Sequence, residues 1–593
     1  MSSLPSNLMA AMLLLPLIGA GIIAAAPRLL AKHIAVGSSL AVFAISIMLA
    51  WQFPEWTSGR FWPNNSASEL ALGVSFTLGI DSVSLLLILL TTFLTPLALL
   101  GSYTSVAHRE REFYAWFLVL LSAMLLAFMA RDVIAFYVGY EFTIVPMLFL
   151  IAIFGGDNRR YAAIKFFVFT FVASVITLSG LIYVAAARAQ TGLPWSFGLA
   201  ELQSFAQSND FSDTQRYWVF VAMMIGFCVK VPFFPVHSWL PLAHDQAPTG
   251  GSVILAGTLL KLGTYGIYRV ALPMAPGAAV EIAPLLITFC IIAIVAISLV
   301  CFAQKDVKRL VAYSSVSHMG VAMLGMLALN PVGVSGSVLY MINHGLSTGA
   351  LFLCIGMMYE RYHTKDMDKL GGLAKKMPIW AFFMVFFTMT SVGLPGLNGF
   401  VSEVMCLLGA FSARPSTALE WPGLIGPRWM LIAGVGSVIF GALYMLYMVG
   451  RVVWGPLKEP GHGHGHGHES SHGHAHAGGH DNHGLPPDLS AREVVTLAPI
   501  AALCLFLGVQ PWYVLDAIGP SATTTIAAYP EAVKNYLRTQ QEAEAAKGSL
   551  AGETTPEITV SPDATSATGG RISSLSDGSA TSHLPISSAT ATP

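Results

Sequence analysis

The feature that most constrains the fold of this chain is a series of long apolar runs separated by short polar segments. The hydrocarbon core of a bilayer is about 30 Å thick and needs roughly 20 apolar residues per helix. Fourteen runs of this kind lie near residues 7–26, 34–52, 80–102, 113–130, 133–154, 162–186, 217–235, 251–273, 282–303, 310–329, 334–358, 378–410, 429–452 and 494–515. They are too long and too uniformly apolar for barrel strands. The sequence therefore predicts an all-α membrane protein with about fourteen transmembrane helices.

The charge content supports this class. Only 11% of the residues are charged, against about 25% in soluble domains. The formal net charge of -1 gives no reason to expect a nucleic-acid partner. The six cysteines all lie in apolar stretches without a CxxC pair, so we interpret them as small core residues rather than metal ligands. The first run is too long for a secretory signal and lacks a basic segment before it.

Lysine and arginine in the loops predict the orientation, because cytoplasmic loops are enriched in both. Loops after odd-numbered runs contain Arg28, Lys32, Arg109, Arg111, Arg159, Arg160, Lys305, Lys308, Arg309, Arg361, Lys365, Lys369, Lys375, Lys376, Arg451, Lys458 and Arg492. Loops after even-numbered runs contain only Arg60, Arg131, Arg188, Arg216, Arg269, Arg414 and Arg428. We therefore expect the odd-numbered loops in the cytoplasm and both termini on the periplasmic side of a bacterial inner membrane.

Six ionisable residues lie inside apolar runs, where a charge costs about 2.5–3.5 kcal/mol even on the lenient insertion scale. They are Glu141, Lys230, Lys261, His318, His344 and Glu403. A polar anchor between packed helices is an equally good explanation for a single histidine. For two lysines and two glutamates together, function is the better explanation.

Two runs also contain residues that break helices. The breakers are Pro232 and Pro235 in the seventh run, and Gly393, Pro395, Gly396 and Gly399 in the twelfth. Each break lies close to a charge, Lys230 in one run and Glu403 in the other. Because five helices separate the two breaks, the pattern indicates two inverted five-helix repeats with discontinuous helices at the site.

Other ionisable residues are spaced by five runs as well. Glu141 corresponds in this way to His318, and Lys165 to His344, although Lys165 is near a helix end and could extend to the surface. A lysine beside a helix break can be hydrated and dry in turn, which changes its proton affinity. Arginine would suit a fixed structural cation better, because it does not release its proton. Lys230 is therefore interpreted as a proton carrier with a movable partner.

Four segments resemble one known family. They read "KVPFFPVHSWLPLAHDQAPTGGSVILAGTLLKLGTYGIYR", "DVKRLVAYSSVSHMG", "INHGLSTGALFLCIGMMYER" and "SVGLPGLNGFVSE". The stretch from about residue 79 to 410 is similar to the antiporter-like membrane subunits of proton-translocating NADH:quinone oxidoreductase, respiratory complex I. Glu403 matches the M branch of this family, because the L and N branches place lysine there.

The resemblance implies fourteen helices, inverted repeats over helices 4–8 and 9–13, and one proton route per subunit. It implies an input pair of Glu141 and Lys230, a central Lys261, a hydrated polar axis with His318 and His344, and a terminal Glu403 in the exit half. The expected divisions are residues 1–112 (first three helices), 113–273 and 274–452 (the repeats), 453–493 (a His-rich cytoplasmic loop), 494–515 (the last helix) and 516–593 (a charged and then disordered tail).

One position departs from the family pattern. The family usually reads W-L-P-D-A-H, whereas this chain reads "WLPLAH", with Leu242 at the acidic position. Asp245 follows three residues later and is a candidate replacement.

No redox centre is expected in this chain, because it lacks cysteine clusters, a nucleotide-binding glycine motif and paired helix histidines for haem. The resemblance implies that the whole complex uses FMN, iron–sulfur clusters, NADH and quinone, and that the partners are L-like and N-like membrane subunits. A subunit of an Mrp-type cation/proton antiporter is the alternative. A purely structural scaffold does not explain the four buried charges.

Residues 461–484, "GHGHGHGHESSHGHAHAGGHDNHG", form a histidine-rich segment. Alternating imidazoles such as His462, His464, His466 and His468 can ligate zinc, nickel or copper. A solvated low-complexity insertion is the favoured alternative. No metal site is expected among the apolar runs.

Overall fold

The computed structural model describes residues 4–62, 76–413, 433–434, 436–460 and 488–552. Across these ranges the regular structure is helical, and β-pairing is limited to five isolated bridges between loop residues. The chain divides into two units, Met1–Thr539 and Gln540–Pro593. The described part of the second unit is helical up to Gly552. The predicted all-α class is confirmed.

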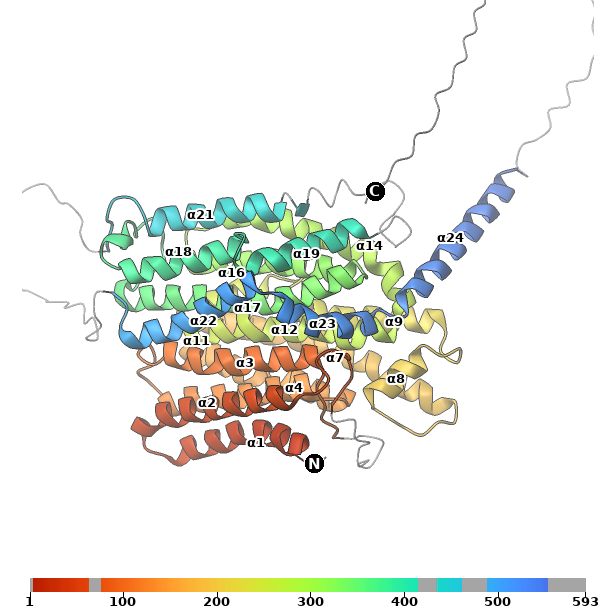
Figure 1. The fold of residues 1–593 in the computed structure, drawn as a ribbon, viewed down its shortest axis with the longest axis horizontal. Coiled ribbons are helices and arrows are strands. Elements are labelled where there is room, and N and C mark those ends of the chain that lie inside the picture. The colour runs from red at the N-terminus through yellow and green to blue at the C-terminus, as the bar shows by residue number, and fades with distance from the viewer. Residues whose placement is uncertain (1–3, 63–75, 414–432, 435, 461–487, 553–593) are drawn as a thin grey trace, which may run out of the picture. The chain divides into compact units, whose positions relative to one another are not determined.

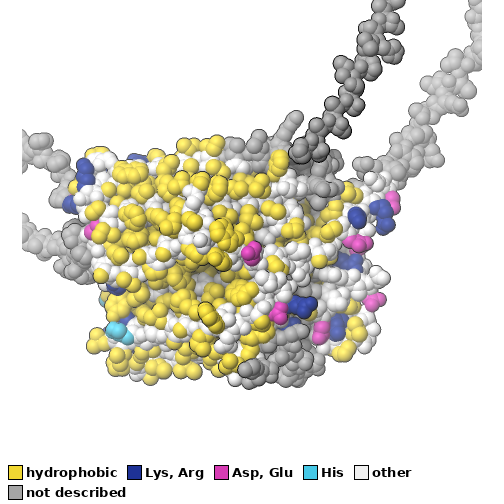
Figure 2. All heavy atoms as spheres, in the orientation of Figure 1, with side chains coloured by type: hydrophobic (Ala, Val, Ile, Leu, Met, Phe, Trp, Pro, Cys, Tyr) yellow, Lys and Arg dark blue, Asp and Glu magenta, His cyan; other side chains and the backbone are white. Residues whose placement is uncertain are grey.

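Ten helices in the described ranges are long and apolar enough to cross a membrane. They are α1 (Leu4–Ala25), α2 (Arg28–Gln52), α3 (Ser82–Gly101), α4 (Glu110–Met129), α5 with α6 (Val133–Phe142, Ile144–Phe154), α7 (Arg159–Gln190), α14 with η4 and α15 (Pro276–Ile292, Ala293–Ile297, Ser298–Phe302), α16 (Val307–Leu327), α17 (Pro331–Tyr362) and α22 (Ala491–Val509). In the first unit these helices lie side by side and nearly parallel (Figure 1). On the face seen in Figure 2, hydrophobic side chains cover most of the surface over these helices, and charged side chains are sparse there.

Shorter helical pieces complete the first unit. They are α8 (Leu199–Ala206), α9 (Asp213–Lys230), α10 (Trp239–Gln246), α11 (Thr249–Ile254), η2 (Leu255–Leu259), α12 (Leu260–Gly266), η3 (Ile267–Ala271), α13 (Leu272–Met274), η5 (Leu373–Lys375), α18 (Pro378–Val392), α19 (Asn398–Ser412), η6 (Gly436–Phe440), α21 (Gly441–Val452), α23 (Trp512–Thr525) and the start of α24 (Tyr529–Gly552). The predicted breaks are present, since α9 ends at Lys230 and α18 ends at Val392.

Two elements differ from the sequence-based expectation. The run 133–154 is divided at Thr143, because Pro146 has no N–H with which to continue the hydrogen-bond ladder. Residues 516–525 were expected in the tail but belong to α23, whose Ser521 donates a hydrogen bond of 2.6 Å to Asp81. Threonine and serine are only moderate helix formers, so the sequence of this segment did not indicate a helix, which tertiary contacts stabilise.

Helices α16 and α17 form the inside of the first unit, whereas α1 and α2 are largely on its outside. Glycines allow the inner helices to approach closely, as is common in membranes. A Cβ added to Gly409 of α19 would lie 2.2 Å from the Cα of Gly333 of α17. The site residues therefore lie on tightly packed helices.

Ion pairs and bridges link loops of the same predicted side. At one end these links include Lys32–Glu110 at 3.2 Å, Arg361–Glu493 at 2.8 Å and the bridge Asp306–Asp366. At the other end they include Asp81–Arg269, Arg188–Glu201 at 3.7 Å and the bridge Asp132–Gly198. This grouping is expected if successive helices cross the membrane in alternating directions. Which end faces the cytoplasm stays a prediction.

Candidate functional site

Lys230 is the last residue of α9, where the helix stops before Pro232. Its side chain is buried, and its Nζ donates to the Tyr140 carbonyl at 2.5 Å and to the Thr143 Oγ1 at 3.0 Å. The ammonium also lies 3.7 Å from the centre of the Tyr140 ring, where the π-face attracts a cation. Lys230 is therefore hydrogen-bonded to polar groups at the point where the helix is divided into α5 and α6.

Glu141 lies between the two residues that bind Lys230. Neither carboxylate oxygen has a hydrogen-bond donor among the described residues, although both are buried. The charge of Lys230 acts on this carboxyl group, and the Ser174 hydroxyl lies close enough to interact with it. The predicted input pair is thus brought together as neighbours without a direct hydrogen bond.

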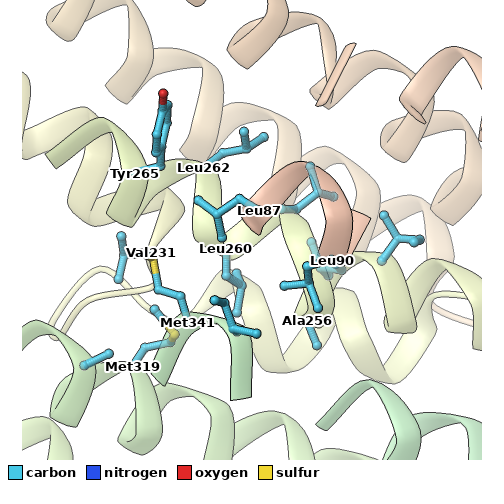
Figure 3. Packing of buried hydrophobic residues seen from close by; sticks show 14 of the residues in the cluster. Leu87, Leu90, Val231, Ala256, Leu260, Leu262, Tyr265, Met319 and Met341 are labelled. Carbon is cyan, nitrogen blue, oxygen red and sulfur yellow. The ribbon is translucent and has the colours of Figure 1, made fainter. Parts of the chain in front are cut away.

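Lys261 is fully buried on α12, directly after the π-helical η2. Its Nζ donates to the Ala256 carbonyl five residues earlier and is 2.8 Å from the His344 Nδ1. π-Helical turns are rare and occur often at functional sites. The neighbouring residues Leu260 and Leu262 belong to the buried hydrophobic core, and Figure 3 shows them among other buried apolar side chains. No carboxylate forms an ion pair with Lys261 in the described part of the chain, so its partners are neutral.

The two predicted histidines extend the row of polar side chains that begins at Lys261. The rings of His344 and His318 have centroids 5.9 Å apart. His318 joins the Tyr340 Oη at 2.8 Å through Nδ1 and the Ser391 Oγ at 3.2 Å through Nε2. The His344 Nε2 is buried and has no partner among the described residues. Both imidazoles therefore lie in a polar line that crosses from α17 to α16.

Glu403 is buried on α19, just after the break that separates α18 from α19. It accepts a hydrogen bond from the Ser437 hydroxyl of η6. Gly393 occupies the break with φ +81°, and a Cβ there would lie 2.8 Å from the Glu403 Oε2. A residue with a side chain would therefore disturb both the turn and the carboxylate.

The structure joins some of the predicted residues and leaves others apart. Lys261 and His344 form a direct contact, and His318 is adjacent to them. In the described ranges, no hydrogen bond links Lys230 to Lys261 or His318 to Glu403. Lys165 lies on α7 with its ammonium 5.6 Å from the centre of the Phe169 ring.

Several polar partners were not predicted from the sequence. Tyr340 is one helical turn before His344, and this spacing was a usable signal. Ser391 and Ser437 reach the site from other helices, and no local pattern indicated either. His244 is also buried, with both ring nitrogens unpartnered among the described residues and its ring stacked on Phe352 at 4.5 Å.

Asp245 lies at the end of the helices where the loops after odd-numbered runs meet. It is close to Leu242, which stands where the family usually has an aspartate. Its carboxylate binds Arg309 at 2.8 Å and Lys365 at 2.5 Å. Burial opposes its ionisation, but the hydrogen bonds and charges of Lys365 and Arg309 outweigh this and hold the pKa of Asp245 below its ordinary value. Asp245 and Lys365 also line a cavity of about 340 Å³. An acid is thus present at this end of the broken helix.

The six cysteines are unpaired and buried, in agreement with their interpretation as core residues. The histidine-rich segment 461–484 lies outside the described residues.

Comparison with known proteins covers most of the chain. Residues 12–130 match the family described as NADH-ubiquinone oxidoreductase chain 4, amino terminus, and residues 130–421 match the family NADH:quinone oxidoreductase/Mrp antiporter, TM. NADH-quinone oxidoreductase subunit M of Rhodobacter capsulatus is 36% identical over 534 residues, which are 88% of this chain and 97% of that protein.

Solved structures share the fold. A chain of respiratory complex I from Thermus thermophilus with bound NADH aligns with a TM-score of 0.74 and 28% identity, covering 88% of this chain and 99% of that one. A chain of the Mrp complex from Dietzia sp. has a TM-score of 0.70 at 21% identity and covers 89% and 99% of the two chains, which shows a common fold alone. From the extent and identity of these matches, the chain belongs to the antiporter-like membrane subunits of NADH:quinone oxidoreductase, in the subunit M branch.

Proposed function

We propose that this chain is the proton-translocating M-type subunit of an NADH:quinone oxidoreductase. Electron transfer from NADH to quinone takes place in other subunits, and this chain moves a proton across the membrane. FMN, iron–sulfur clusters, NADH and quinone belong to those other subunits, and this chain binds none of them. The observation that supports this role best is the contact between Lys261 and His344 inside an apolar helical bundle.

The proposed proton route has two halves. Glu141 and Lys230 take up the proton at the first break, where Lys230 can exchange its carbonyl and hydroxyl partners for the unpartnered carboxylate of Glu141. Lys261 receives the proton in the centre. Because no direct hydrogen bond joins the two lysines, water has to bridge them.

The second half begins at His344. Its Nδ1 takes a proton from the Lys261 ammonium, and the proton at its Nε2 then leaves toward His318. The ring separation of 5.9 Å is too long for a direct hydrogen bond in this arrangement, so water is again required. Tyr340 and Ser391 hold the His318 ring, and Glu403 passes the proton to the exit side.

The architecture is proposed with the same detail. Residues 113–273 and 274–452 form two inverted five-helix repeats within fourteen spans, preceded by residues 1–112 and followed by 453–493, 494–515 and 516–593. The protein lies in a bacterial inner membrane, with both termini in the periplasm and with L-like and N-like subunits as neighbours. The loops after odd-numbered runs are linked by ion pairs and contain most of the basic residues, which supports this orientation.

An Mrp-type cation/proton antiporter subunit is the second candidate, because one matching family model and one structural match include that class. The higher identity to subunit M proteins favours the oxidoreductase.

The deciding experiment is purification of the complex that contains this chain in a mild detergent, followed by identification of its partners. We expect redox subunits, NADH:quinone activity, and proton uptake in proteoliposomes that does not require sodium. A complex without NADH oxidation that exchanges sodium for protons would refute the proposal.

A further inference from the structure

A pair of buried asparagines connects α17 to the break before α19. Asn343 of α17 donates through Nδ2 to the Asn398 carbonyl at 2.7 Å and to the Ser402 Oγ at 3.0 Å. Asn398, the first residue of α19, donates in return to the Asn343 Oδ1 at 3.1 Å. We call these two residues the amide clasp. Its two side chains are 2% and 0% exposed, so these bonds have little competition from solvent.

The clasp is next to the proposed proton route on both helices. Asn343 immediately precedes His344 on α17, and Ser402 immediately precedes Glu403 on α19. A helix rises about 1.5 Å per residue, so a slip of one residue between the two helices would move Glu403 by about that distance and turn it by about 100°. The clasp joins the very segments whose relative position sets the spacing between Glu403 and the histidines.

A second contact between α17 and α19 lies away from the clasp. The helices meet closely at Gly333 and Gly409, and Asn330 Nδ2 donates to the Gly409 carbonyl at 2.7 Å, whereas the clasp lies directly beside His344 and Glu403. The N-terminus of α19 also lacks a side-chain cap, because Leu397 occupies that position. Two amides in an apolar interior cost free energy unless they bind each other, so their presence favours a role in fixing one alignment.

We propose that Asn343 and Asn398 are positioning residues that fix the alignment of α17 and α19, and thereby hold Glu403 at the correct spacing from His344 and His318. This inference rests on the proposed function, because it concerns the exit half of the same route.

The test uses the assembled complex in inverted membrane vesicles. Asn343→Leu removes all three clasp bonds and keeps the number and branching of the side-chain heavy atoms. We expect the rate of NADH-driven proton translocation per assembled complex to fall about tenfold, since misplacement by 1 Å can cost up to ~100-fold. Asn343→Gln, which keeps the amide, should recover part of the rate. Ser337→Ala is the matched control on α17, because the Ser337 Oγ is buried and has no partner among the described residues.

A double-mutant cycle separates positioning from simple stabilisation. If the clasp acts through Glu403, Asn343→Leu should reduce translocation no further in a Glu403→Gln background. The proposal is wrong if Asn343→Leu lowers the amount of complex but leaves the rate per complex unchanged, and the double-mutant cycle shows no coupling to Glu403.

If Asn343→Leu does not assemble, Asn398→Ala decides, because it removes one clasp bond and leaves the two donated by Asn343. A reduced rate per complex that is not additive with Glu403→Gln supports the clasp, and an unchanged or additive rate refutes it. Failure of the proposed function would be visible separately, as absence of NADH-driven translocation in the unmodified complex.

Discussion

Replacement of Lys261 by methionine is the sharpest test of the central step. Lys261 is fully buried and bound to the Ala256 carbonyl and to His344. Methionine has a similar length and fits an apolar site, so the main cost to the fold is about 1–3 kcal/mol for the buried His344 Nδ1 that loses its partner. The titrating group, however, is lost.

The size of the effect follows from the surroundings. Without the amine, a proton has to cross an apolar zone as a charge without a carrier, at a cost of about 2.5–3.5 kcal/mol. This corresponds to a fall in rate of about 70- to 400-fold. His344→Ala leaves Lys261 in place and creates space for water, which can accept the proton from Lys261 and relay it in place of the imidazole, at a cost of about 1 kcal/mol or less, or about fivefold in rate.

The measurement is NADH-driven proton translocation in inverted vesicles, divided by NADH oxidation with an artificial acceptor as a measure of assembled complex. Leu262→Met is the matched control, because Leu262 is equally buried on the same helix and does not titrate. Equal and mild effects of Lys261→Met and His344→Ala would refute the reasoning and indicate a merely polar lining.

Three further predictions address other parts of the chain. Glu141→Gln or Lys230→Ala should reduce coupled activity severely, by about tenfold or more, because each removes a titrating group of the input pair while the complex still assembles; near-normal pumping in either variant would contradict the pairing. Deletion of residues 461–484 should abolish retention on an immobilised nickel column and leave NADH-driven pumping intact, and loss of pumping in that variant would show that the segment has a role in transport. Asp245→Asn should lower the stability of the complex at neutral pH by about 1–3 kcal/mol, less than for a fully buried pair because Arg309 is half-exposed. Since the pKa of Asp245 is lowered in the folded protein, its stabilisation is complete above the unfolded pKa of about 3.9 and is lost as the pH falls further, so thermal unfolding of the parent and the variant should converge at acidic pH; a constant difference would contradict this assignment.

The sequence was sufficient to predict that Lys230, Lys261 and Glu403 lie in the interior, because a charge in an apolar run is costly and therefore easy to notice. Lys230 and Glu403 were further marked by prolines and glycines nearby, and the breaks occur beside them in the structure. The neutral partners could not be found in this way. Ser437 is 34 residues from Glu403 in the sequence. Burying a serine in an apolar run costs much less free energy than burying a charge, so its presence does not indicate a site.

The π-helical turn before Lys261 was also invisible in the sequence. The segment "LAGTLLKLG" contains no proline, and glycines such as its Gly257 and Gly263 are common in membrane helices without a π-helical turn. The wider turn is a property of the tertiary structure, in which the Lys261 ammonium binds the Ala256 carbonyl and reaches His344 at the same time. The same limit applies to α23, whose position depends on contacts of Ser521 with residues far away in the sequence.

The choice between lysine and arginine in the interior follows a physical rule. Arg269 is buried and pairs with the carboxylate of Asp81, and this ion pair also receives Ser521 from α23. A guanidinium keeps its proton, so such a pair is a permanent tie between elements. Lys230 and Lys261 instead contact carbonyl, hydroxyl and imidazole groups, which stabilise an ammonium less than a carboxylate does. A lysine whose hydrogen-bond partners are neutral can release its proton when its surroundings change, whereas a carboxylate that moves next to it, as proposed for Glu141 and Lys230, favours the charged form. In the proposed route, arginine thus serves where the structure must stay fixed, and Lys230 and Lys261 serve where a proton must leave.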